Sequence, residues 1–315
     1  MTKSSVVDVV GVGLNATDTI IPVPVYPSRG SKVAFRSVNV LPGGQVASAV
    51  AACAQWGLRT RYVGKVGDDA AGDLHREEFA RVGVEAHLAV AKGCPSQQAF
   101  ILVDDKGERT VLWKRDERLT LRPEEVRREW IADARVLHVD GHDTAAAAMA
   151  AGWAREAGVP VVADLDELYP GVEELLPNLD YFVTSRDIPG RLTGEQNLRK
   201  ALPDVHRRFG YVLTAATLGE QGVLAWDGTK FWHAAAYRVL VADSIGAGDI
   251  FHAGFIYGLL QKWPLQRQLD FACAAAALNC KAVGARGGIA PVERIEKLMA
   301  ADERYDLDHN WILGD

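Results

Sequence analysis

The sequence predicts an α/β protein built on a doubly wound, mostly parallel sheet, and two patterns support this prediction. Residues 6–12 form a continuous apolar run, which is typical of a strand buried on both faces. From residue 122 onward, short apolar strands alternate with helical stretches. The expected strands are Val136–Val139, Val159–Ala163, Tyr181–Val183 and Tyr211–Ala215. Alternation of this kind indicates a parallel sheet that is covered by helices on both faces.

The first third of the chain adds shorter elements. Residues 19–40 contain three prolines, which favours irregular chain and edge strands. A small, apolar helix is expected over Gln45–Trp56, followed by a strand at about 60–65 and a helix at about 70–82. The segments Gln98–Val103 and Arg109–Trp113 flank Asp104-Asp105-Lys106-Gly107, a pattern that predicts a β-hairpin.

Two helices are expected near the C-terminus, over Ala247–Gln261 and Leu265–Val283.

The composition sets limits on the function. A chain of 315 residues with 48% hydrophobic and 24% charged residues is ordinary for a globular protein. The formal charge of −6 argues against a nucleic-acid surface, and no apolar stretch is long enough to span a membrane. Four cysteines without CxxC spacing fit a reducing compartment, so we expect a cytoplasmic protein.

A glycine-rich turn runs into an apolar helix pattern at residues 243–255. Gly246, Ala247 and Gly248 allow close approach of the backbone to a ligand, and the N–H groups at the start of a helix favour an anion. Asp249 follows directly, and a carboxylate beside an anion site can accept a hydroxyl proton during phosphoryl transfer. The alternatives are a helix-capping Asp and a fragment of a dinucleotide fingerprint that lacks its third glycine.

The heptapeptide Asp243-Ser244-Ile245-Gly246-Ala247-Gly248-Asp249 resembles the signature of the ribokinase-like (PfkB) carbohydrate kinases. Residues 11–18, 41–49, 63–72 and 217–222 are similar to four further elements of that family, in the same order. Five elements in order are far more specific than one, and they extend over nearly the whole chain. Ketohexokinase-like and sulfofructose-kinase-like members look most similar.

The resemblance implies one ribokinase-like three-layer domain over residues 1–315, with a small β lid at about 18–40 and 97–115. In this family the sugar binds between lid and body, and relatives often form homodimers through the lid. The implied reaction moves the γ-phosphoryl of ATP to a hydroxyl of a small sugar, with a ketose favoured. Asp249 would be the base, and Gly246, Ala247 and Gly248 would supply the anion-site amides. Mg²⁺ would be required, with K⁺ as a further cation in relatives.

The resemblance also assigns binding residues. On the sugar side these are Asp18, Asn15, Gly43, Gly44, Gln45 and Ser48, to which the loop residue Asp140 and the lid cation Arg109 are added as candidates. On the nucleotide side they are Thr217, Gly219, Gly222 and Asn279. Gln45 and Ser48 depart from the usual residues and remove a cation often seen in kinases of phosphorylated sugars. We therefore expect a neutral sugar, whereas inward-pointing Arg109, Lys114 and Arg115 would make an anionic sugar plausible.

The metal site departs from the family pattern, because the glutamate of an Asn-x-x-Glu element falls on Ile188. Asp187 and Asp164 are the remaining carboxylate candidates for Mg²⁺, and Asp243 resembles a position that helps to bind a monovalent cation. Two other functions stay open: a sugar-binding regulator without catalysis, suggested by the missing glutamate, and a nucleoside kinase of the same family.

Overall fold

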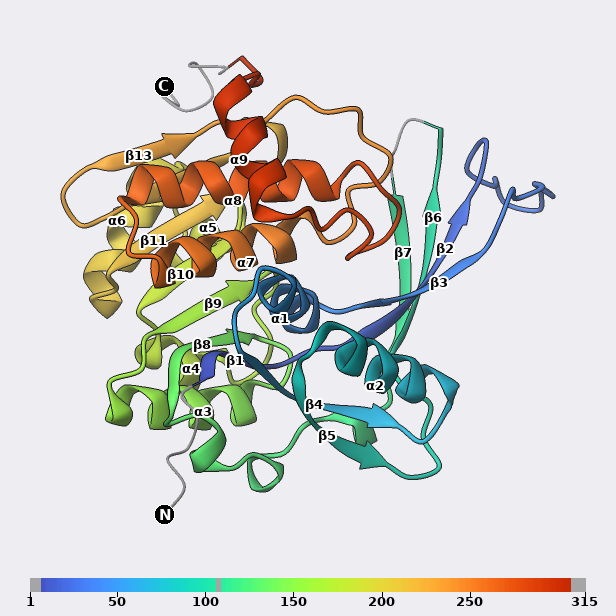
Figure 1. The fold of residues 1–315 in the computed structure, drawn as a ribbon, viewed down its shortest axis with the longest axis horizontal. Coiled ribbons are helices and arrows are strands. Elements are labelled where there is room, and N and C mark those ends of the chain that lie inside the picture. Colours follow the sequence, from blue (N-terminus) through green and yellow to red (C-terminus); the bar gives the residue numbers. More distant parts are fainter. Residues whose placement is uncertain (1–6, 106–108, 307–315) are drawn as a thin grey trace.

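In a computed structural model, which describes residues 7–105 and 109–306, a large sheet lies between two layers of helices and a smaller sheet stands to one side (Figure 1). The large sheet of the described residues has nine strands in the order β13-β12-β11-β10-β9-β8-β1-β4-β5. Its strands are β1 Val7–Val12, β4 Thr60–Gly67, β5 Glu85–Ala91, β8 Ala134–Asp140, β9 Val161–Leu165, β10 Tyr181–Ser185, β11 Leu213–Thr217, β12 Val223–Trp226 and β13 Phe231–Ala234. The pairs from β5 to β11 are parallel, and β12 and β13 are antiparallel.

Successive residues of the buried strands pack into opposite layers. In β1, Val9 belongs to the core beneath α7 and α8, whereas Val10 and Val12 belong to the core on the other face. One layer contains α1 Gln45–Gln55, α2 Ala70–Val82, α7 Ala247–Leu260, α8 Leu265–Asn279 and α9 Val292–Ala301. The other contains α3 Thr144–Ala157, α4 Val172–Leu175, α5 Ile188–Thr193 and α6 Leu198–Phe209. Short 3₁₀ turns lie at Glu117–Leu119, Pro123–Glu125, Arg128–Trp130, Leu176–Asn178 and Gly219–Gln221.

The smaller sheet has four strands among the described residues, in the order β3-β2-β6-β7. They are β2 Ala16–Pro22, β3 Asn39–Gly43, β6 Gln98–Val103 and β7 Arg109–Lys114. Side chains on its inner face, such as Ile101, pack against Ile245 and Ala285 of the body. Phe100 and Leu112 point the other way, with 45% and 60% of their surface exposed. This sheet is the expected lid, and it rests on the loop that carries Asp249.

Most of the expected elements are confirmed to within a few residues, but several expectations need correction. The lid begins at Ala16 and extends to Gly43, because β3 pairs along its whole length with Ala16–Ile20 of β2. β5, β12 and β13 were not expected, since they are short or only partly buried. The helix expected to reach Val283 ends at Asn279, and Lys106 and Gly107 of the predicted hairpin turn lie outside the described residues. In the described part of the chain, no helix combines the length and the apolar character needed to cross a membrane.

Candidate active site

A cavity of about 260 Å³ lies between lid and body, at the carboxyl ends of the central strands. The lid contributes Asp18, Ala99, Ile101, Arg109, Val111 and Trp113. The body contributes Gly44, Gln45, His142, Asp166, Tyr169, Gly246 and Asp249, among others. Ligands in open α/β sheets bind at this end of the strands, so the cavity is the candidate active site.

Gly246 caps the start of α7 and shapes the body side of the cavity. Its φ of 74° is in the left-handed region, and a Cβ atom there would lie 2.4 Å from the Ala285 carbonyl oxygen. Only glycine fits this position without strain. Next to it, a Cβ on Gly248 would meet nothing within 4 Å. The Ala247 N–H donates to the Ser244 carbonyl oxygen at 3.3 Å. The open space beside Gly248 lies at the start of the helix, where an anion could be held.

Two buried polar side chains hold this loop. Asp243 accepts the Ile245 N–H at 2.8 Å and the Gly284 N–H at 2.8 Å. Asn279 donates to the carbonyls of Ile245 and Ala285 and accepts the Gly288 N–H. Asn279 is fully buried, so the expectation that it contacts adenine is replaced by a role inside the loop. Both oxygens of Asp243 already accept backbone hydrogen bonds. The expected cation site at Asp243 therefore stays a prediction.

Asp249 lies in the first turn of α7, and its carboxyl is poised to hold a proton near neutral pH. Burial raises its pKa to about 8, with Asp164 and Asp18 adding to the shift and His252 opposing it. Across the cavity, burial raises the pKa of Asp18 to about 7, although the positive charge of Arg286 acts in the opposite direction. The two carboxyls therefore lie on opposite walls of one cavity, and each can take up or release a proton near neutral pH.

Asp18 owes its position to Gly43 and its charge balance to Arg286. A Cβ on Gly43 would lie 2.1 Å from the Asp18 Oδ2 atom, so only glycine lets the carboxylate sit there. The buried Arg286 donates to the Gly43 carbonyl at 2.9 Å and to Ser48 Oγ at 3.2 Å. Ser48 is fully buried and does not line the cavity, so the structure does not support the expected contact with a sugar. Gly44 and Gln45 do line the cavity.

Asn15 and Asp140 are also turned away from the cavity. Asn15 donates to Tyr62 Oη at 2.9 Å and to the Lys65 carbonyl at 3.1 Å. Asp140 is fully buried and accepts the N–H groups of Leu14 at 2.7 Å and His142 at 3.0 Å. Both side chains therefore brace the turn after β1 and do not line the cavity, so the structure does not support the expected contact of either residue with a sugar. The cavity is lined here by Leu14, Ala16 and His142.

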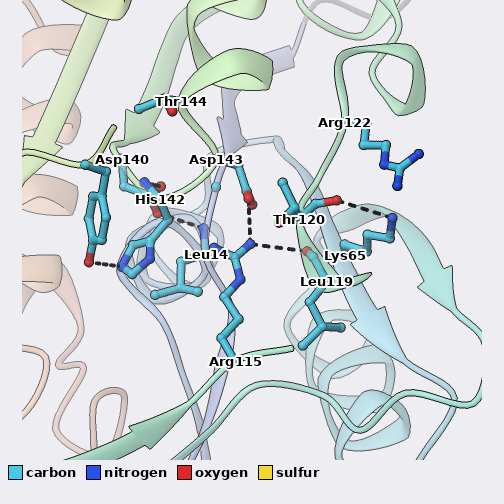
Figure 2. Close-up of polar contacts among 12 residues, drawn as sticks. Leu14, Lys65, Arg115, Leu119, Thr120, Arg122, Asp140, His142, Asp143 and Thr144 are labelled. Atoms are coloured by element: carbon cyan, nitrogen blue, oxygen red, sulfur yellow. Dashed lines mark hydrogen bonds and ion pairs between the residues drawn. The ribbon is translucent and has the colours of Figure 1, made fainter. Parts of the chain in front are cut away.

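The loops after β8 and β9 form the far wall of the cavity. His142 Nε2 lies 3.1 Å from Tyr169 Oη, and the two rings pack with centroids 4.4 Å apart (Figure 2). Burial lowers the pKa of His142 to about 4, so its imidazole is neutral at physiological pH. Asp166 lines the same wall, and burial raises its pKa above the usual value. This end of the cavity therefore presents oxygen acceptors and a neutral ring.

The three lid cations have different environments. Arg109 lines the cavity and donates to Ser244 Oγ at 3.2 Å. Arg115 is held between Asp143, at 2.6 Å, and the Leu119 carbonyl, at 3.2 Å (Figure 2). Lys114 pairs with Gln98 along the hairpin and is exposed. Of the three, Arg109 is the one that meets the cavity, whereas the charge of Arg115 is already neutralised.

The expected nucleotide side lies at the end of β11. Thr217 Oγ1 donates to the Thr184 carbonyl at 3.3 Å, and Gly219 and Gly222 have positive φ in the turn that follows. Asp187, the Mg²⁺ candidate, has 61% of its side chain exposed and lies 3.4 Å from Arg191. Ile188, at the position of the expected glutamate, is fully buried in the core. Among the described residues, no group of three or more His, Cys, Asp or Glu side chains is arranged to hold a metal ion.

Asp164 does not fit the expected role as a magnesium ligand. It is only 5% exposed, and its Oδ2 atom lies 3.3 Å from His252 Nδ1. His252, Asp166 and Arg286 were not among the residues predicted from the sequence. The position of His252, one turn after Asp249, could have indicated that His252 lies near the site. Arg286 stands between small residues, and this local sequence gives no indication of a role.

Comparisons with known proteins agree with this geometry. The model of the pfkB family carbohydrate kinases matches residues 3–292. The ATP-dependent ribose-1-phosphate kinase of Halopiger xanaduensis is 29% identical over 274 residues, which is 85% of this chain and 90% of that protein. The fructoselysine 6-kinase of Escherichia coli is 30% identical over 252 residues, or 77% of this chain and 91% of that protein.

Solved structures agree on the fold. A crystal structure from Agrobacterium tumefaciens has a TM-score of 0.86 at 28% identity and covers 94% of this chain and 98% of that one. The Arabidopsis thaliana ribokinase complexed with ribose and ATP has a TM-score of 0.80 at 23% identity, covering 94% and 99%. The chain belongs to the pfkB family of carbohydrate kinases, which are phosphotransferases with an alcohol group as acceptor. These relatives include no ketohexokinase or sulfofructose kinase, so they do not support the expected nearness to those two groups.

Proposed function

We propose that this enzyme transfers the γ-phosphoryl group of ATP to a hydroxyl of a neutral, polyhydroxylated sugar, with a ketose or a close relative favoured. The observation that carries the proposal is the position of Asp249, directly after the open start of α7 and in one cavity with Asp18. Asp249 would accept the proton of the attacking hydroxyl, and the N–H groups of Gly246–Gly248 would stabilise the moving phosphoryl group.

Asp18 supports a sugar as the acceptor. A carboxylate can accept hydrogen bonds from two neighbouring hydroxyls at once. It lies on the lid and Asp249 lies on the body, so a sugar between them would be held and deprotonated from opposite sides. The pKa of about 8 at Asp249 also suits a general base, since a base works best when its pKa lies near the operating pH.

The charge of the cavity supports a neutral sugar over a sugar phosphate. Asp18, Asp166 and Asp249 line it, and Arg109 is the cation among the described lining residues. Arg109 lies beside Ser244, at the end where the phosphoryl group of ATP would arrive. A second phosphate at the Asp166 end would meet an aspartate and a neutral histidine but no cation among the described lining residues, so nothing there would offset its charge.

ATP would bind beside Thr217, Gly219 and Gly222, with Mg²⁺ held mainly by the phosphates and water. Such coordination needs few protein ligands, in keeping with the core position of Ile188. Asp187, whose oxygens suit Mg²⁺, would contribute from the rim. A monovalent cation such as K⁺ near Asp243 would belong to the same proposal.

A homodimer through the outer face of the lid is also proposed. Val40, Phe100 and Leu112 expose 54%, 45% and 60% of their surface on this sheet, and a second copy would cover them. The double variant F100D/L112D should sediment as a monomer at concentrations where the wild type is a dimer. The matched control V212D changes a body residue that is 55% exposed and should leave the mass unchanged. A wild type that is already monomeric, or a dimer that survives both changes, would contradict this interface.

The substrate is tested by measuring kcat/KM with ATP for fructose, ribose, a hexose phosphate, a sulfosugar and adenosine, with the D249N variant as a background control. We expect fructose or a related neutral sugar to be used best. A hexose phosphate that wins by more than about tenfold, or about 1.4 kcal/mol of transition-state preference, would contradict the neutral pocket. Preference for adenosine would make the chain a nucleoside kinase, and sugar binding without turnover would make it a regulator.

A further inference from the structure

Beneath Asp249, a buried histidine connects the start of α7 to two strands of the central sheet. His252 is 1% exposed and lies one turn after Asp249. Its Nδ1 atom is 2.8 Å from the Gly248 carbonyl oxygen and 3.3 Å from Asp164 Oδ2. Its Nε2 atom is 3.2 Å from the Val183 carbonyl oxygen. One ring thus contacts the anion-site loop, β9 and β10.

The contacts given for the two nitrogens of this ring are all to oxygens of carbonyl or carboxyl groups. A neutral imidazole donates from one nitrogen only, and its other nitrogen would then oppose the lone pairs of a carbonyl. With a proton on both nitrogens, His252 donates to Val183 and Gly248 and is paired with the Asp164 carboxylate. This arrangement contains one proton more than a neutral histidine beside an ionised aspartate, so the His252–Asp164 pair has no net charge.

The neighbouring titratable groups make a neutral pair favourable. Asp249 lies above His252 on α7, Asp166 lies near it at the end of β9, and His138 of β8 stacks on it with ring centroids 5.7 Å apart. Burial lowers the pKa of His138 to about 3, so it brings no charge. Burial also raises the pKa of Asp164 well above its usual value and lowers that of His252, so a lone charge on either group is disfavoured and the pair without net charge is favoured.

We propose that His252 is a positioning residue for phosphoryl transfer, which fixes the Gly248 carbonyl at the anion site and cancels the charge of Asp164 beneath the base Asp249. The inference rests on the proposed function for its kinetic consequences, but its electrostatic part concerns the protein alone. Loss of His252 would leave Asp164 as an uncompensated anion below Asp249. The proton of Asp249 would then be released only at higher pH, because like charges disfavour ionisation.

The experiment follows the ionisation of Asp249 by carboxyl-carbon NMR in protein labelled at aspartate, with the signal assigned from D249N. The variants are H252Q, D164N and H252Q/D164N, and the matched control is H138Q, which changes the neighbouring buried ring. We expect the midpoint of Asp249 to rise by about one pH unit in H252Q and to return in the double variant. It should stay within about 0.3 units of wild type in D164N, because a buried His252 without its carboxylate partner would lose its proton and be neutral. It should also stay there in H138Q, because His138 brings no net charge.

An unchanged midpoint in H252Q would overturn the inference. A clear fall in D164N would also overturn it when nitrogen NMR shows the His252 ring of D164N to be neutral, since the fall would then mean that Asp164 is ionised without compensation in the wild type. If H252Q does not fold, D164N with this ring measurement decides alone. Kinetics give the second readout. H252Q should lose on the order of tenfold in kcat with little change in the KM for the sugar. The acidic limb of its pH–rate profile should move to higher pH. If wild type transfers no phosphoryl group to any sugar, the proposed function fails, but the NMR titration still tests the charge pair.

Discussion

The loop that leads into α7 just before Asp249 and the lid that faces it form opposite walls of one cavity. These two walls are held in place by different kinds of contact. The loop is fixed by directional hydrogen bonds from the buried side chains of Asp243 and Asn279. The lid rests on the same loop through apolar contacts between residues such as Ile101 and Ile245. At the rim of the cavity, Arg109 also donates a hydrogen bond to Ser244 Oγ.

This difference assigns different tasks to the two walls. Buried hydrogen bonds restrict distance and angle, so the N–H groups at the start of α7 are oriented before a substrate arrives. Apolar contact is non-directional, and a sheet held by it can separate from the body at moderate cost. We therefore expect the loop to be preorganised for the chemistry and the lid to open and close over the sugar.

The largest effect is expected at the base. D249N should lower kcat on the order of 10²–10⁴-fold, because it removes the proton acceptor, while sugar binding on the lid side stays nearly intact. Calorimetric sugar affinity and single-turnover kinetics measure the two properties separately, and E173Q serves as the control at an exposed carboxylate of α4. Turnover of D249N near that of wild type would remove Asp249 from this role.

The same substitution should stabilise the fold. The folded-state pKa of Asp249, about 8, lies above its unfolded value, so ionisation destabilises the native state progressively from about pH 4 to about pH 8. The gain in Tm of D249N should therefore grow with pH over this range and level off above it. A gain that shrinks with rising pH would contradict the shift.

The glycines of the loop provide a matched pair. G246A places a Cβ 2.4 Å from the Ala285 carbonyl at a positive φ, so we expect unfolding to become easier by about 1–3 kcal/mol and kcat to fall more than tenfold. G248A meets no atom within 4 Å and should leave Tm unchanged or slightly raised, yet it should weaken ATP binding by filling the anion space. Denaturant melts and ATP titrations check both. Equal stability of the two variants would mean that the loop is not tightly packed.

The lid should respond to sugar more than the loop does. Hydrogen exchange of residues 97–103 is expected to slow by about tenfold when a confirmed sugar is bound, because the closed lid protects its own edge. Exchange at residues 243–249 should change much less. If both segments slow equally, or neither does, the contrast between a fixed wall and a mobile wall is lost.

The smallest effect is expected at the rim. D187A should raise the Mg²⁺ concentration for half-maximal rate by about two- to fivefold, since the ATP phosphates supply most of the coordination. Initial rates over a magnesium series at fixed ATP measure this, with E173A as a control at an exposed carboxylate of α4. An unchanged dependence would assign the role to water or to another carboxylate.

Local sequence patterns predicted the parts of this protein that depend on local physics. The apolar runs of the parallel strands, the small-residue helix after Gly44 and the glycine-rich turn before Asp249 are each properties of a few neighbouring residues. Their order also carried the family resemblance. The resemblance also predicted Asp18 and Asp249 as site residues, because both belong to the matching motifs. These two residues line opposite walls of the cavity.

The tertiary structure decided which way the polar side chains point. Asn15, Ser48 and Asp140 looked like sugar ligands, but each is buried and bonded to residues that are distant in the sequence. His252 and Asp164 are in contact although they lie 88 positions apart in the chain. No local pattern encodes such a pair, because burial and long-range hydrogen bonding arise only when the strands and helices have packed together.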